Sequence, residues 1–216
     1  MEPLSGGGPP GRIVILNGAP RSGKSSIVAA IQESFDAPWV NLGVDLMATA
    51  LAPRYRPGIG LRPGGERPDL AALIPRLYAG LYDSVAAHGR LGLDVVVDVG
   101  HHQPAILADC ARRLRGLPVL FVGLFCPLET IMARRRQGQA GREGLYLTGS
   151  AEEPVPAPVR AWQEAVHRPG LYDLALDTAT TSPADCARRI RTRLEAAPAG
   201  PTAFERLAAA VSSARS

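Results

Sequence analysis

The sequence predicts an α/β fold: a five-stranded parallel sheet with helices on both faces, of the P-loop nucleotide-kinase type, with an arginine-bearing lid. Residues 18–25 match in full the phosphate-binding pattern G-x-x-x-x-G-K-[ST]. This loop lies between a short β-branched apolar run at 12–16 and a helical pattern at 25–32. Further apolar runs and helical patterns then alternate along the chain, which is typical of parallel strands joined by helices.

The residues of the loop have the chemistry needed to hold ATP. Its glycines let the backbone curl, so that successive N–H groups point at one phosphate, and the helix N-terminus favours negative charge. Lys24 can reach the β- and γ-phosphates, and the Ser25 hydroxyl can ligate Mg²⁺. A glycine turn with an incidental lysine is disfavoured, because the pattern and both flanks agree. The predicted nucleotide-binding residues here are Gly18, Ala19, Pro20, Arg21, Ser22, Gly23, Lys24, Ser25 and Ser26.

Composition narrows the class of protein. The chain has 216 residues, 46% of them hydrophobic, which suits one domain with a real core. The net charge is +4, but no basic stripe with interleaved aromatic residues indicates nucleic-acid binding. No apolar segment is long enough for a membrane span. The three cysteines are widely spaced, so we expect buried free thiols in a reducing compartment, the cytoplasm.

We divide the chain into three parts. Residues 1–11 lack a charged and apolar leader and are predicted to form a disordered tail. Residues 12–196 form the P-loop kinase domain, with the lid at about 134–158. Residues 197–216 form a linker and a last helix, which could pack on the body or on a partner. Homo-oligomerisation stays open.

The second strand, at 37–42, leads to a candidate acidic residue. Asp45 follows the carboxyl end of that strand, where open α/β sheets bind ligands. An N-cap of the helix at 46–51 is an equally good interpretation. The stretch 52–68 is rich in Gly, Pro and Arg and cannot form a regular element, so we expect it to border the acceptor substrate. Arg54 and Arg56 are therefore candidate substrate contacts.

The next helix and strand bring a second acid to the same edge. Helical spacing covers 69–88, where Pro75 should introduce a kink. The apolar strand at 93–98 closes on Asp98, whose carboxylate is predicted to order Mg²⁺, often through water. A strand-terminal turn residue is the alternative. His101 and His102 lack a third ligand at metal spacing, so contact with substrate or packing within the loop is expected of them.

Arginines cluster after the following strand. A helix at 103–115 and a buried strand at 117–125 precede a helix that opens at Pro127. Arginines and glycines are interspersed from the end of this helix to Arg142. Phosphoryl-transfer enzymes typically place such arginines, on a lid, over the γ-phosphate. The four arginines of this stretch, from Arg134 to Arg142, are therefore candidates for a catalytic lid. The alternative is a solvated basic helix end, stabilised by the helix dipole.

The last elements complete the nucleotide side. A polar, proline-rich segment at 148–158, which is an insertion or the tip of the lid, and a helix at 159–167 precede a short strand at 172–177. The alternation in this strand indicates an edge or a half-buried position. The loop that starts at Thr178 faces the phosphate loop and is predicted to contact the adenine. Ser182 caps the next helix, which runs to 195, and a capping box at 202–205 opens the last one.

These residues together resemble chloramphenicol phosphotransferase and its relatives, over residues 12–192. The matching pieces are Ile-Leu-Asn-Gly at 15–18, Pro-Trp at 38–39, Gly-Val-Asp at 43–45, the strand ending at Asp98, Val-His at 166–167, Tyr-Asp at 172–173 and Asp-Thr at 177–178. The resemblance implies that ATP donates its γ-phosphate to a primary hydroxyl of an antibiotic. It also implies that Asp45 accepts the hydroxyl proton, that Arg134 matches a lid arginine, and that Arg142 does so less closely.

The departures from that family lie where the acceptor would bind. The lid lacks the family's Arg-Gly-Asp-Arg run, and Val-Gly-His-His follows Asp98 in place of a second acid and an aromatic residue. We therefore expect an ATP- and Mg²⁺-dependent O-phosphotransferase for a nucleoside, a sugar-bearing antibiotic or a chloramphenicol-like compound, in self-resistance or biosynthesis. Alternatives are a metabolite or nucleotide kinase, with arginines of 52–68 in its cleft, and a regulatory switch that binds a partner through the last helix.

Overall fold

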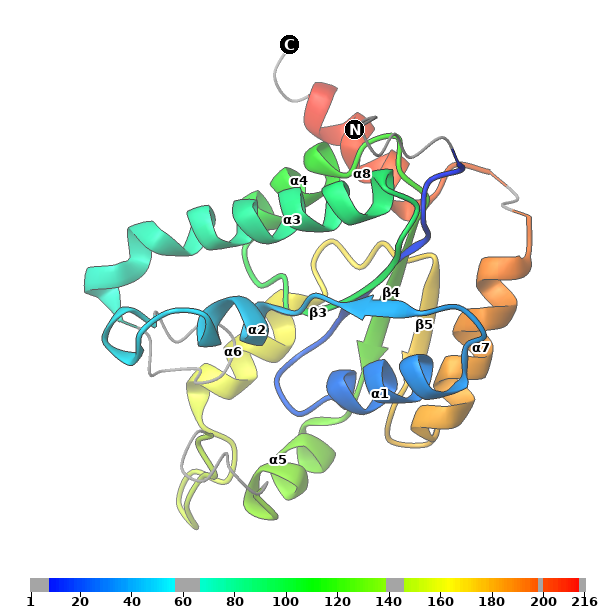
Figure 1. Cartoon of the computed structure of the whole chain (residues 1–216). Coiled ribbons are helices and arrows are strands. Elements are labelled where there is room, and N and C mark those ends of the chain that lie inside the picture. The colour runs from blue at the N-terminus through cyan, green and yellow to red at the C-terminus, as the bar shows by residue number, and fades with distance from the viewer. Residues whose placement is uncertain (1–7, 57–66, 139–145, 198–199, 214–216) are drawn as a thin grey trace.

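A five-stranded parallel sheet forms the centre of the molecule (Figure 1). The computed structural model describes residues 8–56, 67–138, 146–197 and 200–213. The strands are β1 (Ile13–Asn17), β2 (Trp39–Asn41), β3 (Asp94–Val99), β4 (Val119–Phe125) and β5 (Leu174–Asp177). Their order is β2-β3-β1-β4-β5, and every pairing is parallel. The predicted fold class is confirmed, and β5 lies at an edge, which is one of the two positions expected for it.

Helices cover both faces of this sheet because the side chains of β1 alternate between two cores. Ile13 and Ile15 pack with α3 (Ile74–Arg90), α4 (Pro104–Arg113) and α8 (Ala203–Ser213). Val14 and Leu16 pack with α1 (Lys24–Ser34) and α7 (Pro183–Glu195) on the other face. Every residue of β1 is buried, as a central parallel strand requires.

Three further helices lie near the carboxyl ends of the strands (Figure 1). They are α2 (Val44–Thr49), α5 (Leu128–Arg136) and α6 (Ala157–Val166). Helix α2 begins earlier than the sequence predicts and has Gly43 at its N-cap, so Asp45 belongs to its first turn and is not the cap. Strand β3 continues one residue beyond Asp98, to Val99.

One prediction about the segment before β3 is tested only in part, and another is wrong. In the stretch predicted to be irregular, the described residues contain the short 3₁₀ turn Pro53–Tyr55, while residues 57–66 lie outside the described residues. Pro75 does not kink a long helix, because a 3₁₀ segment, Pro68–Leu73, precedes it and α3 starts at Ile74. Proline is tolerated in this first turn because its missing N–H would have no helical partner there.

The start of helix α8 packs on the body of the protein. Thr202 and Glu205 form the predicted capping box, each backbone N–H donating to the other side chain. Phe204 is 5% exposed, and its ring meets that of Phe121 in β4 edge to face, 5.1 Å between centroids. The three cysteines are buried and free, as predicted. Within the described ranges, no helix is long and apolar enough to cross a bilayer.

Replacing the buried ring of α8 should destabilise the whole domain. We expect Phe204→Ala to lower the free energy of unfolding by about 3–4 kcal/mol, because the cavity left under β4 loses both transfer and packing energy. Urea denaturation followed by circular dichroism measures this change. Leu91→Ala is the control, since that side chain is 59% exposed and should cost less than about 0.5 kcal/mol. Equal effects for both variants would contradict the packing of α8.

Candidate functional site

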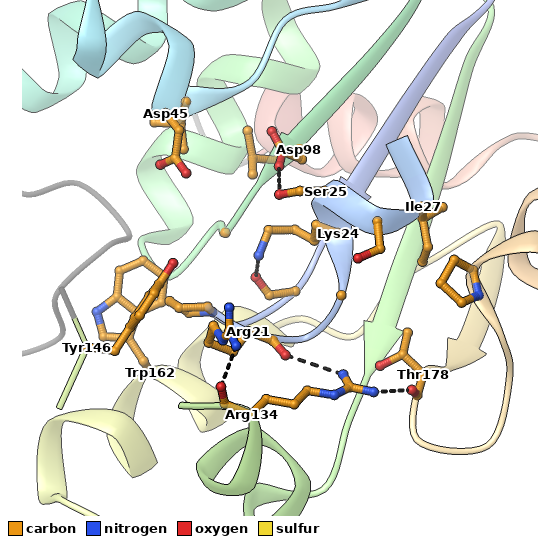
Figure 2. A pocket seen from close by; sticks show the side chains of 18 of the residues that line it. Arg21, Lys24, Ser25, Ile27, Asp45, Asp98, Arg134, Tyr146, Trp162 and Thr178 are labelled. Carbon is orange, nitrogen blue, oxygen red and sulfur yellow. Dashed lines mark hydrogen bonds between the residues drawn. The ribbon is translucent and has the colours of Figure 1, made fainter. Parts of the chain in front are cut away.

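A cavity of about 300 Å³ opens beside the phosphate loop. Residues of six segments line it: the loop with the start of α1, the first turn of α2, the end of β3, α5, α6 with the segment before it, and the residues after β5. Figure 2 shows Lys24 and Ser25 in the middle, Ile27 and Thr178 on one side, and Asp45, Tyr146 and Trp162 on the other. The cavity thus has two ends, with the phosphate loop between them.

The phosphate loop is hydrogen-bonded to the sheet and to its own lysine. The Gly18 N–H donates to the Val99 carbonyl at 3.2 Å, which ties the loop to β3. Lys24 Nζ donates to the carbonyls of Gly18 at 2.8 Å and Ala19 at 2.9 Å. Burial lowers the pKa of Lys24, while the nearby carboxylates of Asp98 and Asp45 oppose that change. Helix α1 starts at Lys24, so its N-terminal N–H groups border the cavity.

The two residues predicted to hold a metal lie together. Ser25 Oγ donates to Asp98 Oδ2 at 3.1 Å. Gly43 permits this arrangement, because a Cβ at that position would collide with the Asp98 carboxylate. One hydroxyl and one carboxylate fit Mg²⁺, which takes oxygen ligands and keeps several waters and substrate phosphates. Among the described residues, no cluster of three or more His, Cys, Asp or Glu side chains offers a different metal site.

Arg134 joins the base of the predicted lid to the end of the cavity at Thr178. Its Nη2 donates to the Thr178 carbonyl at 2.6 Å, and its Nη1 to the Arg21 carbonyl at 3.3 Å. The Arg21 guanidinium in turn donates to the carbonyls of Arg134 and Gly138. The structure therefore brings Arg21, Arg134 and Thr178 together, as predicted, whereas Arg142 lies outside the described residues. Thr181 and Pro183 also line this end.

The other arginines of α5 have different surroundings. Arg135 is buried, which lowers its pKa to about 10, and it stacks over the Tyr146 ring at 5.4 Å. Its Nη1 donates to the Leu147 carbonyl at 3.3 Å. Arg136 is exposed, so the alternative interpretation, a solvated basic helix end, holds for this residue. Three consecutive arginines thus contact the pocket, the interior and the solvent in turn.

An aromatic wall forms the second end of the cavity. Trp162 of α6 and Tyr146 line it, together with Val44 and Asp45 from the first turn of α2. Trp162 is 9% exposed, and His102 stacks on it with ring centroids 3.8 Å apart. The sequence did not single out Trp162 or Tyr146 as site residues. Trp162 belongs to an ordinary helical apolar pattern and Tyr146 to an irregular polar stretch, and neither pattern indicates a cavity.

Several predicted substrate contacts lie elsewhere. Arg54 stacks over Tyr55, and Arg56 donates to the Leu51 carbonyl at 3.0 Å; both are exposed and neither lines the cavity. His101 is buried in the core, not at the rim, so its predicted contact with substrate is corrected to packing. His102 supports the wall from behind Trp162 and is not itself among the lining residues.

His101 is a neutral core histidine. Burial lowers its pKa to about 3, so its ring stays uncharged near neutral pH. The Tyr82 hydroxyl lies 2.6 Å from its Nε2, and Asn17 Oδ1 lies 3.1 Å from its Nδ1. Both ring nitrogens thus have partners inside the protein.

Comparison with known proteins agrees with this fold and with a phosphotransferase family. The model of the family described as chloramphenicol phosphotransferase-like protein matches residues 11–195. A protein of Mycobacterium tuberculosis (strain ATCC 25618 / H37Rv) named "Putative O-phosphotransferase" is 29% identical over 215 residues, covering 93% of this chain and 89% of its own.

Solved structures show the same architecture. The APS kinase of Mycobacterium tuberculosis, in complex with AMPPNP and APS, has a TM-score of 0.59 at 17% identity, covering 88% of this chain and 100% of its own. The tunicamycin resistance protein of Deinococcus radiodurans has a TM-score of 0.60 at 20% identity, covering 88% and 99%. With the phosphate loop and the family match in place, the chain belongs to the chloramphenicol phosphotransferase-like family and is a nucleotide-binding P-loop enzyme of the O-phosphotransferase and kinase type.

Proposed function

We propose that this enzyme transfers the γ-phosphoryl group of ATP, with Mg²⁺, to a hydroxyl of an uncharged, ring-bearing small molecule of the antibiotic or related natural-product class. The observation that carries the proposal is the two-ended cavity. Lys24 and Ser25 lie between a nucleotide end, marked by Arg134 and Thr178, and an end that joins a carboxylate to an aromatic wall. A donor and an acceptor placed at these ends meet at the phosphate loop.

The nucleotide end supplies positive charge and hydrogen-bond donors. Lys24 and the N–H groups of residues 19–25 bind the phosphates, and Arg134 contributes its guanidinium at the edge of the loop. Ser25 and Asp98 hold the Mg²⁺ ion, directly or through water. When bound, that ion neutralises charge on the transferring group. Thr178 and the residues after it border the base.

Asp45 orients the acceptor hydroxyl and accepts its proton. An aspartate of ordinary basicity is a weak base toward an alcohol, so its main contribution is positioning, with proton transfer late in a loose transition state. Asp45 belongs to the first turn of α2 and lines the same cavity as Asp98. The two acids thus have separate roles: Asp98 binds the metal ion, and Asp45 binds the acceptor hydroxyl.

The walls of the acceptor end favour an uncharged ring compound. Trp162 and Tyr146 offer flat apolar faces on which a ring can stack, and Asp45 would repel an anionic group. Arg54 and Arg56, which a nucleotide acceptor would need in the cleft, do not line it. The name of the Deinococcus neighbour, a tunicamycin resistance protein, agrees with an antibiotic acceptor, while its likeness to this chain shows the fold alone.

The two alternative functions lose support. A nucleotide kinase needs cationic contacts for the acceptor phosphate, and the described arginines of the stretch predicted to supply them, Arg54, Arg56 and Arg67, do not line the cavity. A switch that binds its partner through the last helix needs a free helix, whereas the start of α8 is buried against β4.

A panel assay tests the reaction. ADP release from ATP and Mg²⁺ is measured with uncharged hydroxylated antibiotics and nucleosides, and in parallel with nucleoside monophosphates and APS, while mass spectrometry follows each acceptor. We expect an uncharged ring compound to gain the mass of one phosphate. Phosphorylation of the anionic compounds alone, or ATP hydrolysis without any phosphorylated acceptor, would contradict the proposal.

Removing the loop lysine should abolish tight nucleotide binding. Lys24→Met deletes a charged donor that bonds phosphate oxygens, and charge-assisted hydrogen bonds support a loss of about 10- to 100-fold in affinity for a non-hydrolysable ATP analogue. Isothermal titration calorimetry with Mg²⁺ measures it. Arg206→Met, on the exposed face of α8, is the charge-matched control and should bind like the wild type. Unchanged affinity in Lys24→Met would refute the assignment of the loop.

Replacing the acceptor carboxylate should separate binding from turnover. Asp45→Asn keeps the size of the side chain but removes the base. We therefore expect wild-type affinity for the ATP analogue and a kcat that falls by at least about 100-fold. Steady-state kinetics with the acceptor found in the panel measures this. Asp36→Asn, an exposed acid between α1 and β2, serves as the control. A wild-type kcat in Asp45→Asn would remove Asp45 from the mechanism.

A further inference from the structure

We propose that Asn17 is a positioning residue that holds the aromatic wall of the acceptor end against the phosphate loop. Asn17 is the last residue of β1 and directly precedes Gly18. It is 1% exposed and lies between β3 and β4, opposite Val99 and Gly123 in register. The proposal rests on the proposed function in one respect, namely that the Trp162 end of the cavity binds the acceptor. That Asn17 holds this wall in place is argued from the contacts in the core alone.

The side chain of Asn17 makes every hydrogen bond that an amide can make. Its Nδ2 donates to the Val166 carbonyl and to the Tyr172 hydroxyl, each at 2.8 Å. Its Oδ1 accepts from the backbone N–H of His101 at 2.8 Å and lies 3.1 Å from His101 Nδ1. An asparagine offers two donors and two acceptor positions, and all four are used. The backbone partners fix which end is oxygen, because a carbonyl only accepts and an N–H only donates.

This orientation sets the state of the His101 ring. Since Asn17 Oδ1 is an acceptor, His101 Nδ1 carries the proton, and Nε2 accepts from the Tyr82 hydroxyl. The lowered pKa of His101 agrees with a ring that stays neutral in this role. The loop after β3 is thereby fastened to β1 on one side and to α3 on the other.

Of the three segments that the Asn17 side chain bonds, two meet at the acceptor wall: α6 and the loop after β3. Val166 ends α6 and lies one turn after Trp162, on the same helical face. Gly100 directly precedes His101, and a Cβ at Gly100 would lie 2.9 Å from Trp162 Cζ3 and 3.2 Å from the Gly18 carbonyl. Helix α6, the loop after β3 and the phosphate loop therefore meet at one point, and Asn17 bonds two of these segments while its own backbone continues into the third.

The nucleotide end has supports of its own. The Gly18 N–H bonds to Val99, Lys24 bonds to the loop carbonyls, and Arg134 ties the lid base to Thr178, all without the Asn17 side chain. Loss of the Asn17 contacts should therefore shift Trp162 and weaken acceptor binding, while the ATP site keeps its shape. A role confined to stability would instead lower the melting temperature and leave both KM values unchanged.

Two variants test this separation. Tyr172→Phe keeps the ring but removes the hydroxyl, which accepts from the amide, lies 2.9 Å from His167 Nδ1 and donates to the Val166 carbonyl at 3.4 Å. We expect the KM of the acceptor to rise at least about 5-fold, since the strongest of these contacts is the one to Asn17, with the KM of ATP within about 2-fold of the wild type. Asn17→Ala removes all four bonds and should raise the acceptor KM further. Tyr78→Phe is the matched control: Tyr78 is buried in the same core, and its hydroxyl has no hydrogen-bond partner among the described residues, so neither KM should change.

A second readout does not need an acceptor. In a Trp39→Phe background, Trp162 is the remaining tryptophan, and its quenching by acrylamide reports how the wall is held. We expect more quenching in Tyr172→Phe than in Tyr78→Phe. Equal quenching in these two variants, or equal changes in both KM values, would overturn the role of Asn17. A wild-type enzyme that phosphorylates no acceptor, yet shows the predicted quenching, would contradict the proposed function and not this inference.

Discussion

The parallel pairing of β1 with β3 and β4 is the constraint on which the site depends. It sets Leu16 beside Asp98 and Asn17 beside Val99, so the strand that ends in the phosphate loop and the strand that carries Asp98 finish at the same edge. The bond from the Gly18 N–H to the Val99 carbonyl then fixes the loop at that edge. Ser25 reaches Asp98 only because these strands are adjacent, in register and parallel.

Local patterns in the sequence were sufficient to predict the sheet and the nucleotide end. The phosphate loop, the apolar strands and the capping box each lie within a few consecutive residues, and Asp98 could be placed because parallel strands end at one edge. The acceptor end could not be predicted, because its contacts join distant segments. Asn17 bonds Val166 across 149 residues, and no short pattern marks Trp162 as part of a wall or His101 as part of the core.

The arginines show how far composition can mislead. A loop rich in arginine was expected to bind the acceptor, yet Arg54 and Arg56 stack on or bond to their own neighbours. Arg135, one residue after the pocket arginine, is buried against Tyr146. A helix turns by about 100° per residue, so consecutive like residues face different surroundings. The positive charge of the cavity therefore lies beside the phosphate loop, and the end that we assign to the acceptor is aromatic and acidic.

The central claim, that one cavity aligns a nucleotide and an uncharged alcohol across the phosphate loop, is tested most directly by a crystal structure. The enzyme would be crystallised with Mg²⁺, a non-hydrolysable ATP analogue and the acceptor found in the panel assay. The account predicts Mg²⁺ beside Ser25 and Asp98, the acceptor ring against Trp162, and the acceptor hydroxyl within about 3.2 Å of the Asp45 carboxylate. An acceptor hydroxyl bound away from Asp45, or a metal ion bound without Ser25, would contradict it.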